Sequence, residues 1–123
     1  MAKFTVNNVE FEYDLFDADK VELYENEFAK VRKEAEKALK NVGNEKFSKS
    51  IRNVCSIIRN VIDALFGDGK SYELFADKNN LLDIAVTLHK IETETTKASI
   101  AEGTEALQIL TELEAKPTIK VTK

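Results

Sequence analysis

The sequence predicts a mainly α-helical (α+β) fold, a bundle of about four helices with an N-terminal β-hairpin. Only four glycines and one proline occur in 123 residues, and helix-favouring residues dominate the composition. Apolar residues recur at spacings of three and four along most of the chain, whereas strict alternation is confined to its start. A chain of 13.9 kDa is the size of one domain. We therefore expect a single domain over residues 1–115, followed by a C-terminal tail over residues 116–123.

The hairpin is predicted over residues 3–13. Asparagine accepts positive φ angles, so Asn7-Asn8 suits a tight two-residue turn. The residues on either side alternate, which places these apolar side chains on common faces: Phe4, Val6, Val9, Phe11 and Tyr13. Two strands alone are only marginally stable in water, so the hairpin should pack against the helices.

A first helix of about 22 residues is predicted after the hairpin. Asp19 suits the N-cap, and Glu22, three residues later, completes a capping box. Gly43-Asn44 should end the helix, because glycine readily takes the left-handed conformation of a C-terminal cap. The apolar face expected between these ends comprises Val21, Tyr24, Phe28, Val31, Ala35, Ala38 and Val42.

A second helix is predicted from about Lys46 to Phe66, and its broad apolar stripe indicates the central helix of the core. Cys55 lies on this stripe and is interpreted as a small buried hydrophobe, since no histidine is placed to activate it as a nucleophile. A single cysteine also excludes an internal disulfide and a cysteine-cluster metal site.

Residues 64–71, ALFGDGKS, fit a loose form of the nucleotide-binding P-loop. A P-loop follows a buried strand, however, and here the preceding residues have helical spacing. We therefore expect Gly67 to cap the preceding helix, Asp68-Gly69 to form a turn, and Ser71 or its neighbour to begin a short helix that covers the core.

The last helix is predicted to begin near Leu81. The run ETETTK at residues 92–97, followed by Gly103, favours a break or bend, and Pro117 should stop the helix. Beyond the break, an apolar stripe exceeds the needs of a small core. Its residues either pack within the molecule or mediate self-association or binding of another protein, and the candidate protein-interaction residues are Ile100, Leu107, Leu110 and Leu113.

No other site is predicted. His89 is a boundary residue on the last helix, and Asp17, Asp19 and Glu22 lack the glycine and closing glutamate of a calcium loop. We expect no catalytic, cofactor-binding or metal-binding residues and no enzymatic activity. The nearest approach to a basic patch is better explained as a solvated helix face than as a nucleic-acid site; it comprises Lys46, Lys49, Arg52 and Arg59.

Localisation is expected to be cytoplasmic. The first residues have no apolar run typical of a secretion signal. A membrane helix needs about 18 or more consecutive apolar residues, and the sequence contains no such stretch.

Two segments carry a family resemblance: NNVEFEYDLFDADKVELYENEFAKV and SIRNVCSIIRNVIDALFGDGKSYELFADKNNLLDIAVTL. The matching features include FDAD at 16–19, LFGDG at 65–69 and LFADKNNL at 74–81. Over residues 4–90 the chain resembles small proteins encoded in the tail-gene region of phages and prophages of Gram-positive bacteria, beside the tape-measure gene. These proteins are regarded as tail assembly chaperones.

The resemblance implies a protein of the bacterial host cytoplasm that binds the tape-measure protein and aids assembly of the tail tube around it. The expected partners are therefore the tape-measure and other tail proteins, with homo-oligomers also possible and neither nucleic acid nor a membrane involved. The alternative is a structural or DNA-packaging accessory protein of the virion, which is also non-enzymatic.

Overall fold

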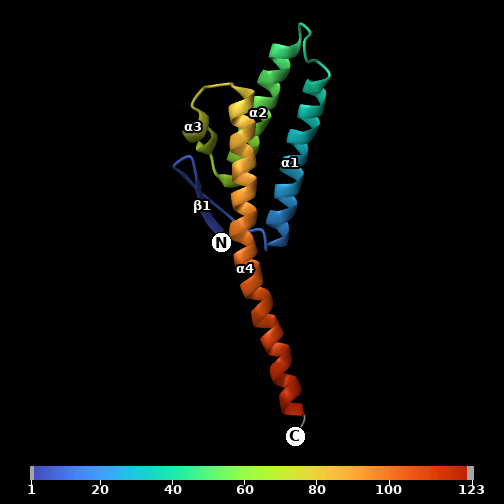
Figure 1. Cartoon of the computed structure of the whole chain (residues 1–123), viewed down its shortest axis with the longest axis vertical. Helices are drawn as coiled ribbons and strands as arrows, with labels where there is room; N and C mark the ends of the chain where they lie inside the picture. The colour runs from blue at the N-terminus through green and yellow to red at the C-terminus, as the bar shows by residue number, and fades with distance from the viewer. Residues whose placement is uncertain (1, 122–123) are drawn as a thin grey trace.

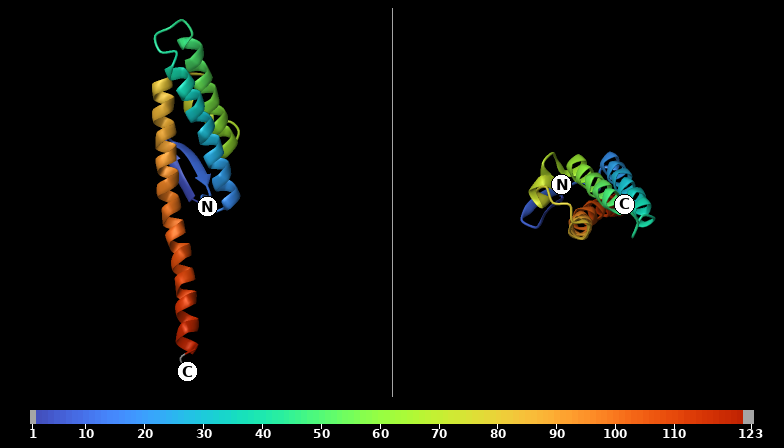
Figure 2. Two further views of the ribbon diagram at one scale, coloured as in Figure 1. Left: turned by 90° about the vertical axis from the view of Figure 1, so that its right-hand side faces the viewer. Right: turned by 90° about the horizontal axis from the view of Figure 1, so that it is seen from above.

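The computed structural model describes residues 2–121 of the chain and the side chains of residues 2–113. The elements follow in the order β1 (Ala2–Val6), β2 (Val9–Tyr13), α1 (Ala18–Leu39), α2 (Phe47–Phe66), α3 (Lys70–Phe75) and α4 (Leu81–Val121). The predicted fold class, mainly α with an N-terminal hairpin, is confirmed. α1 packs along α2, and α4 lies across α2 with the hairpin and α3 on the side away from α1 (Figures 1 and 2).

The hairpin forms as its sequence predicts. Asn7 and Asn8 both take positive φ, 50° and 65°, and the strands pair antiparallel with Val6 opposite Val9. Phe4 and Phe11 face each other across the strands, with their rings stacked at 5.5 Å. The edge of the Phe66 ring meets both of them, so the hairpin is fixed to the C-terminal end of α2 by aromatic packing.

α2 is the central helix, as its broad apolar stripe predicts. Its side chains at Val54, Ile58, Val61 and Ile62 are almost completely buried, between the hairpin and the flanking helices. Cys55 is fully buried among them, which confirms its interpretation as a core residue. Burial raises the pKa of the Cys55 thiol, and nearby Arg59 partly opposes the shift.

The ends of α1 differ from the prediction. Asp17, and not Asp19, is the N-cap: its Oδ1 accepts the N–H groups of Asp19 and Lys20 at 3.0 and 3.2 Å. The reason is conformational, because an N-cap needs an extended backbone and Asp17 has one (φ −98°, ψ 118°). α1 also ends at Leu39, before Gly43.

α4 is continuous where the sequence predicted a break. The hydroxyls of Thr95 and Thr96 donate to the carbonyls of Ile91 and Glu92, four residues earlier, so these threonines are accommodated within the helix. Gly103 is buried in the helix beneath the ring of Phe16; a Cβ there would lie 1.9 Å from the ring's Cζ. The glycine therefore serves close packing rather than a bend.

The predicted stop at Pro117 is also not observed. The helix passes through Pro117 to Val121, so residues 116–121 of the expected tail are helical and the remaining two residues lie outside the described part. A proline within a helix removes one backbone hydrogen bond but already has a helical φ. The second half of α4 projects well beyond the rest of the molecule (Figure 1), and every side chain from residue 104 to 113 is exposed.

The cap assignment is testable by two alanine substitutions. We expect Asp17→Ala to lower the free energy of unfolding by about 1 kcal/mol, because two helix N–H groups lose their acceptor. Asp19→Ala, in the first turn, should cost less, about 0.5 kcal/mol, since it removes only a favourable interaction with the helix dipole. Urea unfolding of both variants measures the difference, and an equal or reversed order would contradict the assignment.

The contact between Gly103 and Phe16 predicts that substitutions at these two positions have non-additive effects on the free energy of unfolding. Alanine favours a helix over glycine by about 1 kcal/mol, but in the native protein its methyl group must displace the Phe16 ring. We expect Gly103→Ala to stabilise the Phe16→Ala variant more than the native chain, with a coupling of about 1 kcal/mol. Urea unfolding of the four proteins gives the coupling energy, and additive effects would show that the ring does not rest on Gly103.

Candidate protein-binding surface

The turn between α2 and α3, residues 67–69, is held in place by hydrogen bonds from the two residues that follow it. The Nζ of Lys70 donates to the carbonyl oxygen of Glu10 at 2.7 Å and lies 5.7 Å above the ring of Phe11. The N–H and Oγ of Ser71 both donate to the carboxylate of Asp63, at 2.9 and 3.2 Å. The two side chains that a P-loop would turn toward phosphate and magnesium are thus bonded to the protein itself.

The glycines of this turn behave as the sequence predicts. Gly67 is the C-cap of α2, and its N–H donates to the carbonyl of Asp63. Gly69 takes a left-handed φ of 90° at the start of α3. The element entering the turn is a 20-residue helix rather than a strand, which contradicts the P-loop interpretation.

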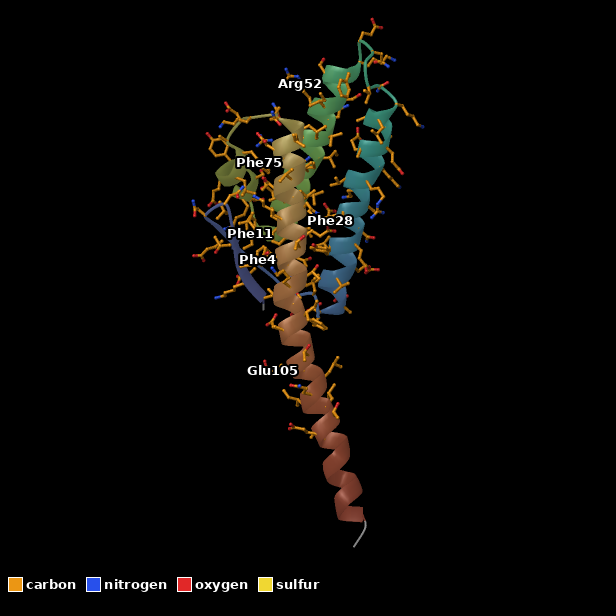
Figure 3. All side chains as sticks on the ribbon, in the orientation of Figure 1. Phe4, Phe11, Phe28, Arg52, Phe75 and Glu105 are labelled. Carbon is orange, nitrogen blue, oxygen red and sulfur yellow. The ribbon has the colours of Figure 1, made fainter. Side chains whose placement is uncertain are left out.

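Of the four basic residues singled out in the sequence, Arg59 is engaged within the protein. Arg59 donates to the carbonyls of Ala76 and Lys78 and lies over the ring of Phe75, so it fixes the connection between α3 and α4. Arg52 lies instead at the upper end of α2 (Figure 3).

Two further findings concern ligands and membranes. The described part of the chain contains no group of three or more His, Cys, Asp or Glu side chains arranged to hold a metal ion. His89 is exposed, with its Nδ1 3.7 Å from a carboxylate oxygen of Glu92. Within the described residues, no helix combines the length and apolar character needed to span a bilayer.

An apolar groove of about 360 Å³ runs between α1 and α4, above α2. We call it the α1–α4 groove. α1 forms one wall, the start of α4 forms the other, and α2 forms the floor. The lining residues are Val31, Ala35, Ala38 and Leu39 of α1, Val42 in the turn after it, Phe47, Val54 and Ile58 of α2, and Leu81, Ala85 and Leu88 of α4.

The groove exists because side-chain size changes along α1. In the first half of α1, Tyr24 and Phe28 stack at 4.5 Å, and Phe28 lies between α1 and α4 (Figure 3). About two to three turns beyond Phe28, alanines take their place on α1, at Ala35 and Ala38, and Ala85 of α4 lines the same groove. Leu39 at the rim is 72% exposed, so apolar surface is left accessible.

Tyr24 lies outside the groove, where it borders Thr96 and Ser99 of α4. Its hydroxyl is buried and forms no hydrogen bond that meets standard geometry with the described residues. Burial raises the pKa of Tyr24 to about 12; the carboxylate of Glu92 adds to the shift and the neighbouring Thr95 hydroxyl opposes it.

The four predicted interaction residues are all more than half exposed but fall into two places. Ile100 borders the body of the molecule, beside Leu15 and Phe16. Three others follow at intervals of three on the projecting half of α4, where helical geometry puts them on one face together with Ala106. We call this face the α4 stripe: Ala106, Leu107, Leu110 and Leu113.

The α1–α4 groove was not predicted from the sequence. Its residues were assigned to the core, because an amphipathic pattern shows which face of a helix is apolar but not what covers that face. The change from aromatic residues to alanine along one face of α1 was the feature of the sequence that could have predicted a groove. It predicts one only when α4 is known to lie opposite that face.

The fold and this surface define a small, mainly helical domain with an open apolar groove at one end and an exposed helix at the other. A model of the family of unknown function DUF6673 matches residues 7–114. The chain belongs to this family. Neither the curated proteins nor the solved structures give a match.

The buried hydroxyl of Tyr24 predicts a loss of stability at alkaline pH. Its pKa is about 12 in the folded protein against 10.0 ordinarily, so the unfolded chain releases this proton first as the pH rises. The contribution is therefore complete below pH 10 and is lost between pH 10 and pH 12. We expect Tyr24→Phe to reduce the alkaline loss, and to change stability at neutral pH by less than about 1 kcal/mol because the hydroxyl has at most one weak contact to lose, with the Thr95 hydroxyl.

Urea unfolding at pH 8 and at several values above pH 10 measures this effect. The same substitution at Tyr72, whose side chain is 66% exposed, is the control and should keep the native alkaline loss. An unchanged pH dependence in Tyr24→Phe would show that this hydroxyl is not the group responsible.

Proposed function

We propose that the protein is a non-enzymatic assembly chaperone of phage tails that holds an amphipathic helix of the tape-measure protein in the α1–α4 groove. The single observation that carries the proposal is the groove itself, an open apolar surface between two helices whose walls could receive the apolar side chains of a third helix. The identity of the client rests on the resemblance of residues 4–90 to tail assembly chaperones.

The dimensions of the groove suit a helix. Its α1 wall runs from Val31 to Leu39, a rise of about 12 Å at 1.5 Å per residue. A client helix with apolar residues at positions i, i+3, i+4 and i+7 would set them along this length and leave its polar face in water. Burial of these side chains is the driving force, at roughly 25 cal/mol for each Å² of apolar surface removed from water.

A chaperone of this kind covers apolar faces of a long helical protein until tail-tube subunits replace it. The groove supports such a role because its apolar walls are accessible in the isolated molecule and need no rearrangement of the core to receive a helix. The proposed setting is the cytoplasm of the bacterial host, where tails assemble.

A pull-down of a tape-measure protein from the proposed phage source tests the proposal. We expect the native protein to retain it and Ala85→Glu to weaken retention by roughly tenfold or more, because the new carboxylate would be buried against an apolar helix face. Ala85 is exposed in the groove wall, so the substitution leaves the core intact. Ala101→Glu, also exposed on α4 but outside the groove, is the matched control and should bind normally.

Equal retention by both variants, or no retention by the native protein, would contradict the proposal. Mass spectrometry of purified mature tails separates the alternative. A chaperone leaves before the tail is complete, whereas stoichiometric amounts of the protein in finished tails would identify a structural component of the virion.

A further inference from the structure

We propose that the α4 stripe of one molecule docks in the α1–α4 groove of a second molecule, so that copies of this chain join head to tail. The inference concerns the chain alone and does not depend on the identity of a client, and a client helix bound in the groove would compete with the stripe of the second copy. Both surfaces are apolar and accessible in the isolated molecule: Leu107, Leu110 and Leu113 are each more than half exposed, and the groove lining is almost entirely hydrocarbon.

The two ends of the molecule carry opposite charge. Residues 30–52, which include the upper part of α1 and the start of α2, contain eight Lys or Arg against three Glu. Residues 10–27, toward the other end, contain eight Asp or Glu against one Lys, and residues 98–113 contain three Glu and neither Lys nor Arg. Figure 3 shows Arg52 near the upper end and Glu105 on the projecting helix. The acidic helix therefore suits the basic end that holds the groove.

The lengths of the two surfaces agree. The α4 stripe extends from Ala106 to Leu113, about 10 Å along the helix, and fits within the wall of about 12 Å from Val31 to Leu39. The outer half of α4, when docked, would lie over α2 between α1 and α4 of the second molecule. It would take the position of the fourth long helix in a four-helix bundle, the arrangement in which each helix buries one apolar face against its neighbours.

The geometry of α4 decides which occupant is favoured. The stripe and the groove lie at opposite ends of one continuous helix, so the stripe cannot reach the groove of its own molecule (Figures 1 and 2). Pairing of two stripes with each other would bring two acidic segments together, which costs electrostatic energy. Docking of a stripe at the basic end of another copy avoids both problems.

Head-to-tail contacts do not close on themselves, because each bound molecule offers a further groove and a further stripe. With Leu110 beside Ala85 of the next molecule, successive copies are displaced by about 38 Å along α4. The products expected at rising concentration are therefore open oligomers of increasing length rather than a single dimer.

Analytical ultracentrifugation of the purified native chain tests the inference. We expect mass to increase progressively with protein concentration up to about 1 mM, and to fall on addition of salt, which screens the charges of the two ends. Leu110→Glu in the stripe and Ala85→Glu in the groove should each remain monomeric when alone. Ala101→Glu should assemble like the native chain.

Mixing the two defective variants gives the decisive measurement. Ala85→Glu keeps an intact stripe and Leu110→Glu keeps an intact groove, so an equimolar mixture should form dimers of twice the monomer mass and nothing larger. Circular dichroism checks that both variants stay folded, which is expected since both positions are exposed.

Three outcomes would overturn the inference. The native chain could remain monomeric throughout the concentration range. Ala85→Glu could assemble like the native chain while Leu110→Glu does not, which would indicate pairing of stripes. The mixture of variants could stay monomeric, which would show that the stripe and the groove are not complementary surfaces.

Discussion

Ile58 and Ile62 of α2 are withdrawn almost completely from solvent, at 2% and 0% exposure, and every other element is placed by the need to cover them and their neighbours. An apolar stripe this broad cannot be covered by one partner helix. α1 takes one side, and the hairpin and α3 take the other, with α4 in front of α2 (Figure 1). The alanines on facing walls of α1 and α4 leave part of the upper surface uncovered, and the groove is the result.

Local chemistry allowed much of the fold to be predicted. The Asn7-Asn8 turn, the alternating strands and the helical spacing in α2 depend on near neighbours in the sequence, and the structure confirms all three. The choice of Asp17 over Asp19 as the cap of α1 depends on a backbone conformation that both residues could adopt from sequence alone, and the role of Gly103 in α4 depends on a distant contact. Gly103 signals a bend from sequence alone, and only the presence of Phe16, 87 residues earlier, shows that its missing side chain makes room for a ring. The groove escaped prediction for the same reason, since it is a relation between two helices.

The turn after α2 shows how a nucleotide-binding pattern can arise from structural needs. Gly67 and Gly69 both take positive φ angles, a lysine follows to anchor the hairpin through the carbonyl of Glu10, and a serine follows to meet Asp63. Each of these residues has a structural role in this turn that does not involve a bound phosphate. A motif of this kind identifies a phosphate site only when the preceding element is a strand and the following helix points its free N–H groups at the ligand.

The continuity of α4 also affects how readily its outer half can bind. Starting a helix in water is unfavourable, because several residues must be ordered before the first hydrogen bond forms. The part of α4 in the core, around Ile84, Leu88 and Ile91, is already ordered by its packing and so provides the first helical turns. The outer turns of α4 extend this existing helix, which costs less free energy than starting a new one. The outer half is therefore preorganised for a partner, and less of the binding free energy is lost in ordering it.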